Sequence, residues 1–118
     1  MGWLDDYFTA WSEGDADAVT SFMADDIDYQ DTAQDKRWIG TDAVRGEVEH
    51  AHGQGVTFEL VRSFEGPDHF CAEWVMQPHG IRAVSVGVIE DGRIASVTDY
   101  WNNPRPAGRN DEDPAATG

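Results

Sequence analysis

Two aspartates and a tyrosine occupy positions where an apolar residue would be expected. Asp31 ends an alternating segment that begins at Ile27, and Asp99 stands two residues before Trp101 in a similar segment. A carboxyl group partly withdrawn from water has a raised pKa and can take a proton and return it. Tyr7 lies on the apolar stripe of a helical pattern, and its hydroxyl can donate a hydrogen bond to a carbonyl or enolate oxygen. These residue types predict acid–base chemistry, with Asp31 as the general base.

Each of the three residues also has a structural interpretation. Asp31 could cap the polar stretch 32–37 or pair with Arg37, because aspartates often close loops. Asp99 could pair with an arginine or cap the end of a strand. Tyr7 could be a core residue whose hydroxyl reaches the surface. Sequence alone leaves these alternatives open.

The first half of the chain has the periodicity of helices. Apolar residues at spacings of three and four predict a helix over residues 3–12, and a shorter helix follows over 18–23. Asp15 or Asp17 is the expected N-cap of the second helix, and Thr41 or Asp42 that of a third helix that runs to about residue 52.

The second half of the chain alternates between apolar and polar residues, as strands do. Strands are predicted over residues 27–31, 56–64, 69–77, 82–90 and 93–101, with 32–37 as a loop. Helices followed by an antiparallel meander predict an α+β fold with a curved antiparallel or mixed sheet. The apolar patterning stops at Pro104, so we expect one domain over residues 1–103 and a disordered acidic tail over 104–118.

The strand over 82–90 has two unlike faces. The Asp91-Gly92 hairpin places the small residues Ala83, Ser85 and Gly87 on the inner face, where they would leave room for a ligand. The valines at 84, 86 and 88 then point outward. An exposed apolar sheet face is usually an interface, so we expect a homodimer through the outer face.

The charge excludes several classes of partner. The 118 residues carry a formal net charge of −15, from 23 acidic and 8 basic residues. Binding to nucleic acid or to an anionic membrane needs clustered lysine and arginine, so neither partner is expected. A single cysteine, no membrane-length apolar run and no signal peptide favour the cytoplasm.

The remaining reactive side chains suggest no further chemistry. None of the four histidines is expected in the pocket or has metal-ligand spacing, so no metal and no cofactor are predicted. Cys71 is expected to face away from the pocket and to be structural.

The order of these features resembles a known superfamily. The run Y-F-T-A-W-S-E-G-D-A-D-A-V-T-S-F-M-A-D-D-I-D-Y-Q-D, followed by W-I-G-T-D-A-V-R, resembles the opening of NTF2-like, or ketosteroid isomerase-like, proteins. The resemblance covers roughly residues 3–103 and implies a cone in which a curved sheet wraps a long helix. In the isomerases the matching tyrosine binds the developing oxyanion and the matching aspartate moves the proton, which implies these roles for Tyr7 and Asp31.

One position departs from the isomerases. Their oxyanion site adds a neutral aspartic acid, and the hairpin alignment places Ser85 there. A serine hydroxyl is a weaker donor than a buried carboxylic acid, so the departure argues against steroid isomerase activity itself. Asp99, an acid or a second base on the last strand, partly offsets the loss.

Other members of the superfamily supply the alternatives. Asp99 followed by Trp101 resembles the ending of SnoaL-like polyketide cyclases and limonene epoxide hydrolases, where the last strand carries a proton-transferring acid. Tyr29-Gln30-Asp31 also resembles the hydrolase motif that holds the attacking water. Trp74 and Met76 occupy the positions of the arginine and aspartate that the hydrolase needs, which argues against that chemistry.

The predicted site is therefore an apolar pocket with acid–base groups. Tyr7, Asp31 and Asp99 are the expected catalytic residues. The expected substrate-binding residues are Trp11, Met23, Tyr29, Trp74, Met76, Ser85, Val97 and Trp101. The predicted activity is cofactor-independent, isomerase-like proton abstraction on a small hydrophobic carbonyl compound such as a steroid, terpenoid or polyketide. A SnoaL-like cyclase, a related hydrolase or dehydratase, and a non-catalytic ligand-binding dimer remain the alternatives.

Overall fold

A computed structural model of the chain describes residues 2–102 as three helices and six strands. The helices are α1 (Trp3–Glu13), α2 (Ala16–Ser21) and α3 (Thr41–Gly53). The strands are β1 (Met23–Asp31), β2 (Lys36–Ile39), β3 (Thr57–Glu65), β4 (His69–Gln77), β5 (Ile81–Glu90) and β6 (Arg93–Trp101). The predicted tail, residues 104–118, lies outside the described residues. No helix within residues 2–102 is long and apolar enough to cross a membrane.

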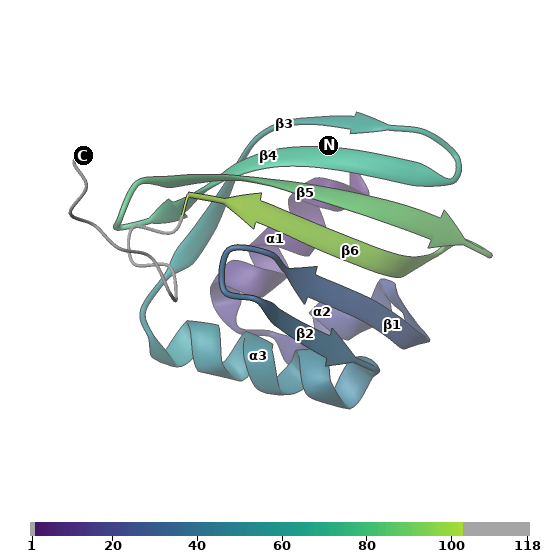
Figure 1. The fold of residues 1–118 in the computed structure, drawn as a ribbon, viewed down its shortest axis with the longest axis horizontal. Helices are drawn as coiled ribbons and strands as arrows, with labels where there is room; N and C mark the ends of the chain where they lie inside the picture. The colour runs from purple at the N-terminus through teal and green to yellow at the C-terminus, as the bar shows by residue number, and fades with distance from the viewer. Residues whose placement is uncertain (1, 103–118) are drawn as a thin grey trace.

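All six strands form one mixed sheet in the order β2-β1-β6-β5-β4-β3 (Figure 1). Strands β3 to β6 make the predicted antiparallel meander. The last strand, β6, then lies parallel to β1 from the beginning of the chain. This pairing makes Asp31 and Asp99 register partners on neighbouring strands. The α+β prediction is confirmed.

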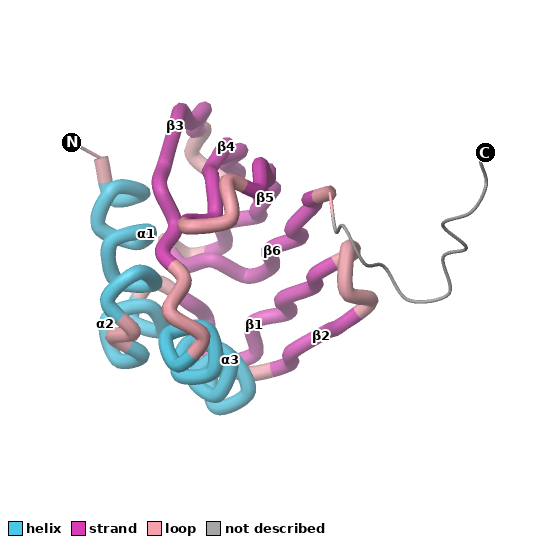
Figure 2. The backbone as a smooth tube through the Cα atoms, turned by 90° about the vertical axis from the view of Figure 1, so that its left-hand side faces the viewer, coloured by secondary structure: helices cyan, strands magenta, loops and turns pink. Residues whose placement is uncertain are grey.

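The helices gather on the concave side of the curved sheet, as the side view shows (Figure 2). Helix α1 packs along β3, and α3 lies beneath β1 and β2. Irregularities in the strand pairing between Leu60 and Arg62 and between Val88 and Ile89 accompany the bend, because bulges increase local twist. The fully buried side chains between the layers include Leu4, Val19, Met23, Ile27, Val44, Val48, Phe70, Ile94 and Val97.

Two helix boundaries differ from the prediction. Helix α2 begins earlier than expected because the Asp15 carboxylate caps it, accepting a hydrogen bond from the Ala18 amide at 3.1 Å. Met23, expected at the end of this helix, instead begins β1. Helix α3 is preceded by Gly40 as its N-cap and has no side-chain cap, so the prediction of Thr41 or Asp42 was wrong.

The last two residues of the predicted loop 32–37 belong to a strand, β2. Asp35 adopts a left-handed conformation with φ 54°, and the chain turns there to form β2 against β1. Strand β2 is short, lies at the edge of the sheet and is mostly exposed. Its sequence therefore lacks the apolar alternation that reveals a half-buried strand.

The two faces of β5 are oriented as predicted. Ala83, Ser85 and Gly87 are buried, whereas Val86 and Val88 are more than 40% exposed on the outer face. The space above Gly87 is not free for a ligand, however. A Cβ atom there would lie 2.0 Å from the ring of Phe70. The absence of a side chain on Gly87 therefore leaves room for the Phe70 ring in the core.

Candidate functional site

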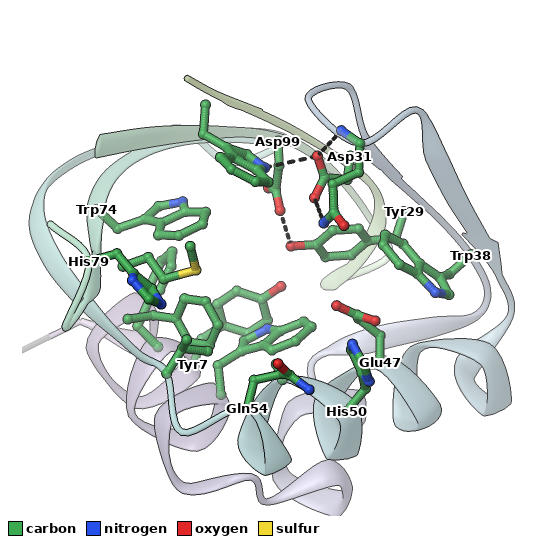
Figure 3. Close-up of a pocket in the computed structure, with 18 residues that line it drawn as sticks. Tyr7, Tyr29, Asp31, Trp38, Glu47, His50, Gln54, Trp74, His79 and Asp99 are labelled. Carbon is green, nitrogen blue, oxygen red and sulfur yellow. Dashed lines mark hydrogen bonds between the residues drawn. The ribbon is translucent and has the colours of Figure 1, made fainter. Parts of the chain in front are cut away.

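A cavity of about 310 Å³ opens between the concave face of the sheet and helices α1 and α3. Figure 3 shows side chains from both layers converging on it. Its lining residues are Tyr7, Phe8, Trp11, Tyr29, Asp31, Gln34, Trp38, Glu47, His50, Ala51, Gln54, Val56, Phe58, Trp74, Met76, His79, Asp99 and Trp101. Eight of these 18 residues are phenylalanine, tyrosine or tryptophan, and three are acidic.

The structure brings together most of the residues singled out from the sequence. Tyr7, Asp31 and Asp99 line the cavity, as do Trp11, Tyr29, Trp74, Met76 and Trp101. Met23 and Val97 are instead buried in the core and do not line it. Ser85 does not line the cavity, but it forms hydrogen bonds with two lining residues, Trp74 and Asp99.

Asp99 is held by a chain of buried hydrogen bonds. Tyr29 donates its hydroxyl to Oδ2 at 2.5 Å, and Ser85 donates its hydroxyl to Oδ1 at 2.5 Å. The indole nitrogen of Trp74 donates in turn to the Ser85 oxygen at 2.8 Å. These bonds fix the direction of the carboxyl group, so Ser85 acts by positioning Asp99.

Burial has the largest influence on the pKa of Asp99, which is only 5% exposed. The pKa of Asp99 is raised from 3.8 to about 7, chiefly by loss of solvent and to a smaller extent by the nearby charges of Asp31 and Glu47. The hydrogen bonds from Ser85 and Tyr29 lower it but do not cancel the effect of burial. Asp99 can therefore gain or lose a proton near neutral pH.

Asp31 lies beside Asp99 but has different partners. Its Oδ1 accepts hydrogen bonds from the amides of Ala33 and Gln34 and from the indole nitrogen of Trp101, at 2.9 to 3.1 Å. Its Oδ2 accepts one from the Gln34 side chain at 2.8 Å (Figure 3). Asp31 is thus the cap of the loop between β1 and β2.

The other structural role considered for Asp31 is not observed. Arg37 pairs with Asp28 through two hydrogen bonds of 2.8 and 2.5 Å on the exposed side of the β1–β2 hairpin. This pair lowers the pKa of Asp28, chiefly through the hydrogen bond. The arginine therefore contributes no charge to the cavity wall.

Tyr7 presents a buried hydroxyl without a hydrogen-bond partner in the described structure. The residue is 2% exposed, and its hydroxyl points toward that of Tyr29 in Figure 3. Desolvation is the main reason that its pKa is raised. A buried hydroxyl that lacks a partner carries a free-energy cost, which a ligand oxygen could remove by accepting its hydrogen bond.

Several lining residues were missed from the sequence. Glu47 and His50 project from α3, Gln54 follows the last residue of that helix, and His79 comes from the turn after β4 (Figure 3). The expectation that no histidine lies in the pocket was therefore wrong for His50 and His79. Helical spacing offered a signal for these residues, because positions 47, 50 and 54 lie on the same side of the helix as the buried Ala51.

Burial also affects Glu47. It raises the pKa of this carboxyl group, an effect that the charges of His50 and Lys36 oppose and that of Asp31 strengthens. Within residues 2–102, no group of three or more histidine, cysteine or acidic side chains is arranged to hold a metal ion. The described side chains of the cavity therefore offer proton-transfer groups and apolar contact.

A family comparison matches most of the chain. The profile described as SnoaL-like domain covers residues 4–97. This span includes all of α1 except Trp3, the other two helices, strands β1 to β5 and the first half of β6. No curated protein sequence matches the chain significantly.

Solved structures show the same fold at low sequence identity. A protein with a ketosteroid isomerase-like fold from Catenulispora acidiphila, in complex with trimethylamine, is 18% identical, with a TM-score of 0.76 over 84% of each chain. A candidate polyketide cyclase from Sinorhizobium meliloti is 22% identical, with a TM-score of 0.72 over 82% of this chain and 92% of its own. A candidate isomerase of the SnoaL-like family from Agrobacterium tumefaciens is 20% identical, with a TM-score of 0.71 over 85% and 94%. Others are SnoaL-like or NTF2-like proteins of unknown function.

Proposed function

Since the chain belongs to the SnoaL-like domain family, with an NTF2-like fold, we propose that it is a cofactor-independent acid–base enzyme. Its substrate would be a small hydrophobic carbonyl compound such as a steroid, terpenoid or polyketide. The observation that carries the proposal is Asp99, a buried carboxyl group on the cavity wall whose pKa lies near 7. A general base is most effective when its pKa is close to the working pH.

The proposed reaction is movement of a double bond by proton transfer. The Asp99 carboxylate takes a proton from the carbon next to the carbonyl group as the C–H bond breaks. The bonding electrons move to the carbonyl oxygen and form an enolate. Returning the proton to another carbon along the conjugated system completes the isomerisation and restores Asp99.

Tyr7 is the proposed oxyanion donor. Its hydroxyl has no partner in the described structure and lies in the same wall as Asp99. A donor that is already oriented and dry stabilises charge that develops on an oxygen without reorganising water. The enolate would therefore accept the hydrogen bond that Tyr7 lacks in the free protein.

Asp31 has a different role in this proposal from the one predicted by sequence. Its four hydrogen bonds fix the loop at the cavity, so we assign it to positioning and assign proton transfer to Asp99. The general base predicted from the sequence, Asp31, is the alternative that the experiments below separate from Asp99.

The proposal is tested by incubating the protein in deuterated buffer with a series of β,γ-unsaturated cyclic ketones. Proton NMR follows deuterium incorporation next to the carbonyl group, and ultraviolet absorbance follows formation of the conjugated enone. We expect exchange with the wild type and its loss in Asp99→Asn. Asp6→Asn, on the exposed side of α1, is the matched control. Equal exchange rates in the wild type and Asp99→Asn would overturn the assignment.

Two alternatives remain for the same cavity. A SnoaL-like cyclase would use Asp99 as an acid in ring closure, and the Sinorhizobium protein supports that possibility. A related hydrolase or dehydratase would use the same acid. A non-catalytic binder would hold its ligand without turnover, and the Catenulispora structure is of a complex with a small molecule, trimethylamine. Ligand binding without exchange or product formation on any ketone would favour the binder.

The protein is also proposed to act as a homodimer through the outer sheet face. Phe64, Val86, Val88 and Tyr100 are between 42% and 67% exposed. Phe64 on β3 pairs with Cys71 on β4, which in turn pairs with Val86 on β5. Phe64 and Val86 therefore lie in one apolar row across the sheet. Light scattering should give a dimer mass that Val86→Lys reduces to that of a monomer. A monomeric wild type would contradict this part of the proposal.

A further inference from the structure

The cavity wall combines aromatic rings and acidic groups without a permanent positive charge. Four tryptophans, two phenylalanines and two tyrosines line it, together with the carboxyl groups of Asp31, Glu47 and Asp99. No lysine or arginine is among the described lining residues. A cavity for an uncharged ketone alone would need only the proton-transfer group and the apolar surface.

Glu47 is the acid that the proposed reaction leaves unused. It projects from α3 toward Tyr29, across the cavity from Asp31 and Asp99 (Figure 3). Its side chain is half-buried, and no residue from 2 to 102 forms a hydrogen bond or ion pair with its carboxylate. By contrast, both carboxyl groups across the cavity are held by hydrogen bonds. A partly desolvated carboxylate without a partner is costly, and a cation would compensate it.

The arginines nearest to these elements are already paired elsewhere. Arg37 binds Asp28 on the outside of the β1–β2 hairpin, and Arg45 binds Asp17 across α3 and α2. His50 lies beside Glu47 but is exposed, and it carries charge only when protonated. The charge of Lys36 on β2 also favours the ionised form of Glu47, but Lys36 is exposed and is not among the lining residues. Among the described residues, no lysine or arginine that lines the cavity is therefore a counter-ion for Glu47.

Aromatic rings next to Glu47 offer a surface that also favours cations. Trp11, Tyr29 and Trp38 form a continuous cluster in which the ring centroids of neighbouring members lie 5.8 Å apart. The faces of such rings attract ammonium groups, most strongly where water is excluded. Rings and carboxylate together form the kind of cage that recognises substituted ammonium ions.

We propose that the natural ligand carries an organic cation, a protonated or quaternary amine, seated between Glu47 and the cluster of Trp11, Tyr29 and Trp38. This inference rests on the proposed function, since the carbonyl group of the same molecule would reach toward Tyr7. The buried Tyr7 hydroxyl, which lacks a partner, independently indicates a ligand oxygen at the inner end. The substrate class is thus an apolar carbonyl compound with a basic nitrogen.

The test compares two ligands of one shape. Acetylcholine has a carbonyl group and a trimethylammonium group, and its neutral carbon isostere has a tert-butyl group in place of the cation. Quenching of tryptophan fluorescence gives the Kd of each. We expect acetylcholine to bind about tenfold more tightly in low salt. Added sodium chloride should weaken acetylcholine binding and leave the isostere unchanged.

Glu47→Gln removes the charge and keeps the shape of the side chain. We expect it to abolish the preference for acetylcholine, whereas Glu49→Gln, exposed on the same helix, should retain that preference. Equal binding of the two ligands to the wild type, no detectable binding of acetylcholine, or a preference that survives in Glu47→Gln would each overturn the inference. Binding requires no turnover, so loss of ketone exchange in Asp99→Asn tests the proposed function separately.

Discussion

Asp31 and Asp99 are identical residues at paired positions on parallel neighbouring strands, and both are at least 94% buried. Four donors, from the loop after β1 and from Trp101, surround Asp31. Two hydroxyl groups hold Asp99, on the central strand β6. Similar burial therefore does not give these two carboxyl groups the same chemistry: Asp31 caps a loop, whereas Asp99 is proposed to exchange a proton.

The physical difference lies in what replaces water around each carboxylate. Loop amides supply Asp31 with fixed donors, as water would have done. The hydroxyl groups of Tyr29 and Ser85 are too few to offset the desolvation of Asp99, so its pKa remains raised. Dividing acid and base roles between two carboxyl groups requires such unlike surroundings.

The largest expected effect is on the rate of proton exchange. Asp99→Asn should lower it by about a thousandfold, in the range of a lost general base, whereas Asp31→Asn should lower it less than about tenfold. Deuterium incorporation into the same ketone measures both variants. If Asp31→Asn has the larger effect, the base is Asp31, the residue predicted from the sequence, and Asp99 is not the proton-transfer group.

Tyr7→Phe should separate activity from stability. Removing the oxyanion donor should slow exchange by about a hundredfold. The free energy of unfolding should stay the same or rise by up to about 1 kcal/mol, because the buried hydroxyl has no protein partner to lose. Urea denaturation and the exchange assay measure the two quantities. A large loss of stability would mean that the hydroxyl has a structural role.

Stability should depend on pH through Asp99. Its folded pKa of about 7 lies above the ordinary 3.8, so the group stabilises the fold fully below pH 3.8 and loses that contribution as pH rises through 7. Between pH 5 and pH 7.5 the loss should be about 2 to 3 kcal/mol. Urea denaturation of the wild type should show this fall more steeply than that of Asp99→Asn. Identical slopes would place the folded pKa near its ordinary value.

The smallest expected effect compares two aspartates on β1. Asp31→Asn should lower the free energy of unfolding by about 1 to 3 kcal/mol, because it disturbs a buried set of hydrogen bonds. Asp28→Asn should cost less, since its pair with Arg37 is exposed to solvent. Thermal and urea denaturation measure both. Equal costs would show that the loop tolerates a change in its cap.

Much of the fold was predictable because its signals are local. Alternation over 69–77 and 93–101 matches β4 and β6, and the Asp91-Gly92 hairpin correctly oriented β5. Strand β2 was missed because an edge strand need not bury either face. Asp35 turns the chain in a left-handed conformation. Aspartate tolerates this conformation, but an aspartate in the sequence does not by itself predict it.

Of the residues that line the cavity, only some of those on the strands and on α1 were predicted from the sequence. Tyr7, Asp31 and Asp99 were found because a polar residue on an apolar stripe is visible in one segment of sequence. Glu47 and His50 were missed because α3 is polar over most of its surface, so their shared face with Ala51 was not distinguished from the solvent-exposed faces. Val97 was expected at the ligand because alternation identifies the inward face of a strand but not how far a side chain lies from the cavity. Met23 was expected there as an inward residue of the second helix, but it begins β1 and lies in the core.

The sequence by itself determined the α+β class, the inner and outer faces of the meander and the presence of acids on the inner face. All of these depend on side-chain periodicity within a single segment. Only the tertiary structure decided that Asp31 caps a loop while Asp99 is held by Tyr29 and Ser85. The donors of the Asp31 cap include the neighbouring residues Ala33 and Gln34, whereas Tyr29 and Ser85 lie on strands that are distant from Asp99 in sequence. The burial that raises the pKa of Asp99 exists only once the sheet has closed around the helices.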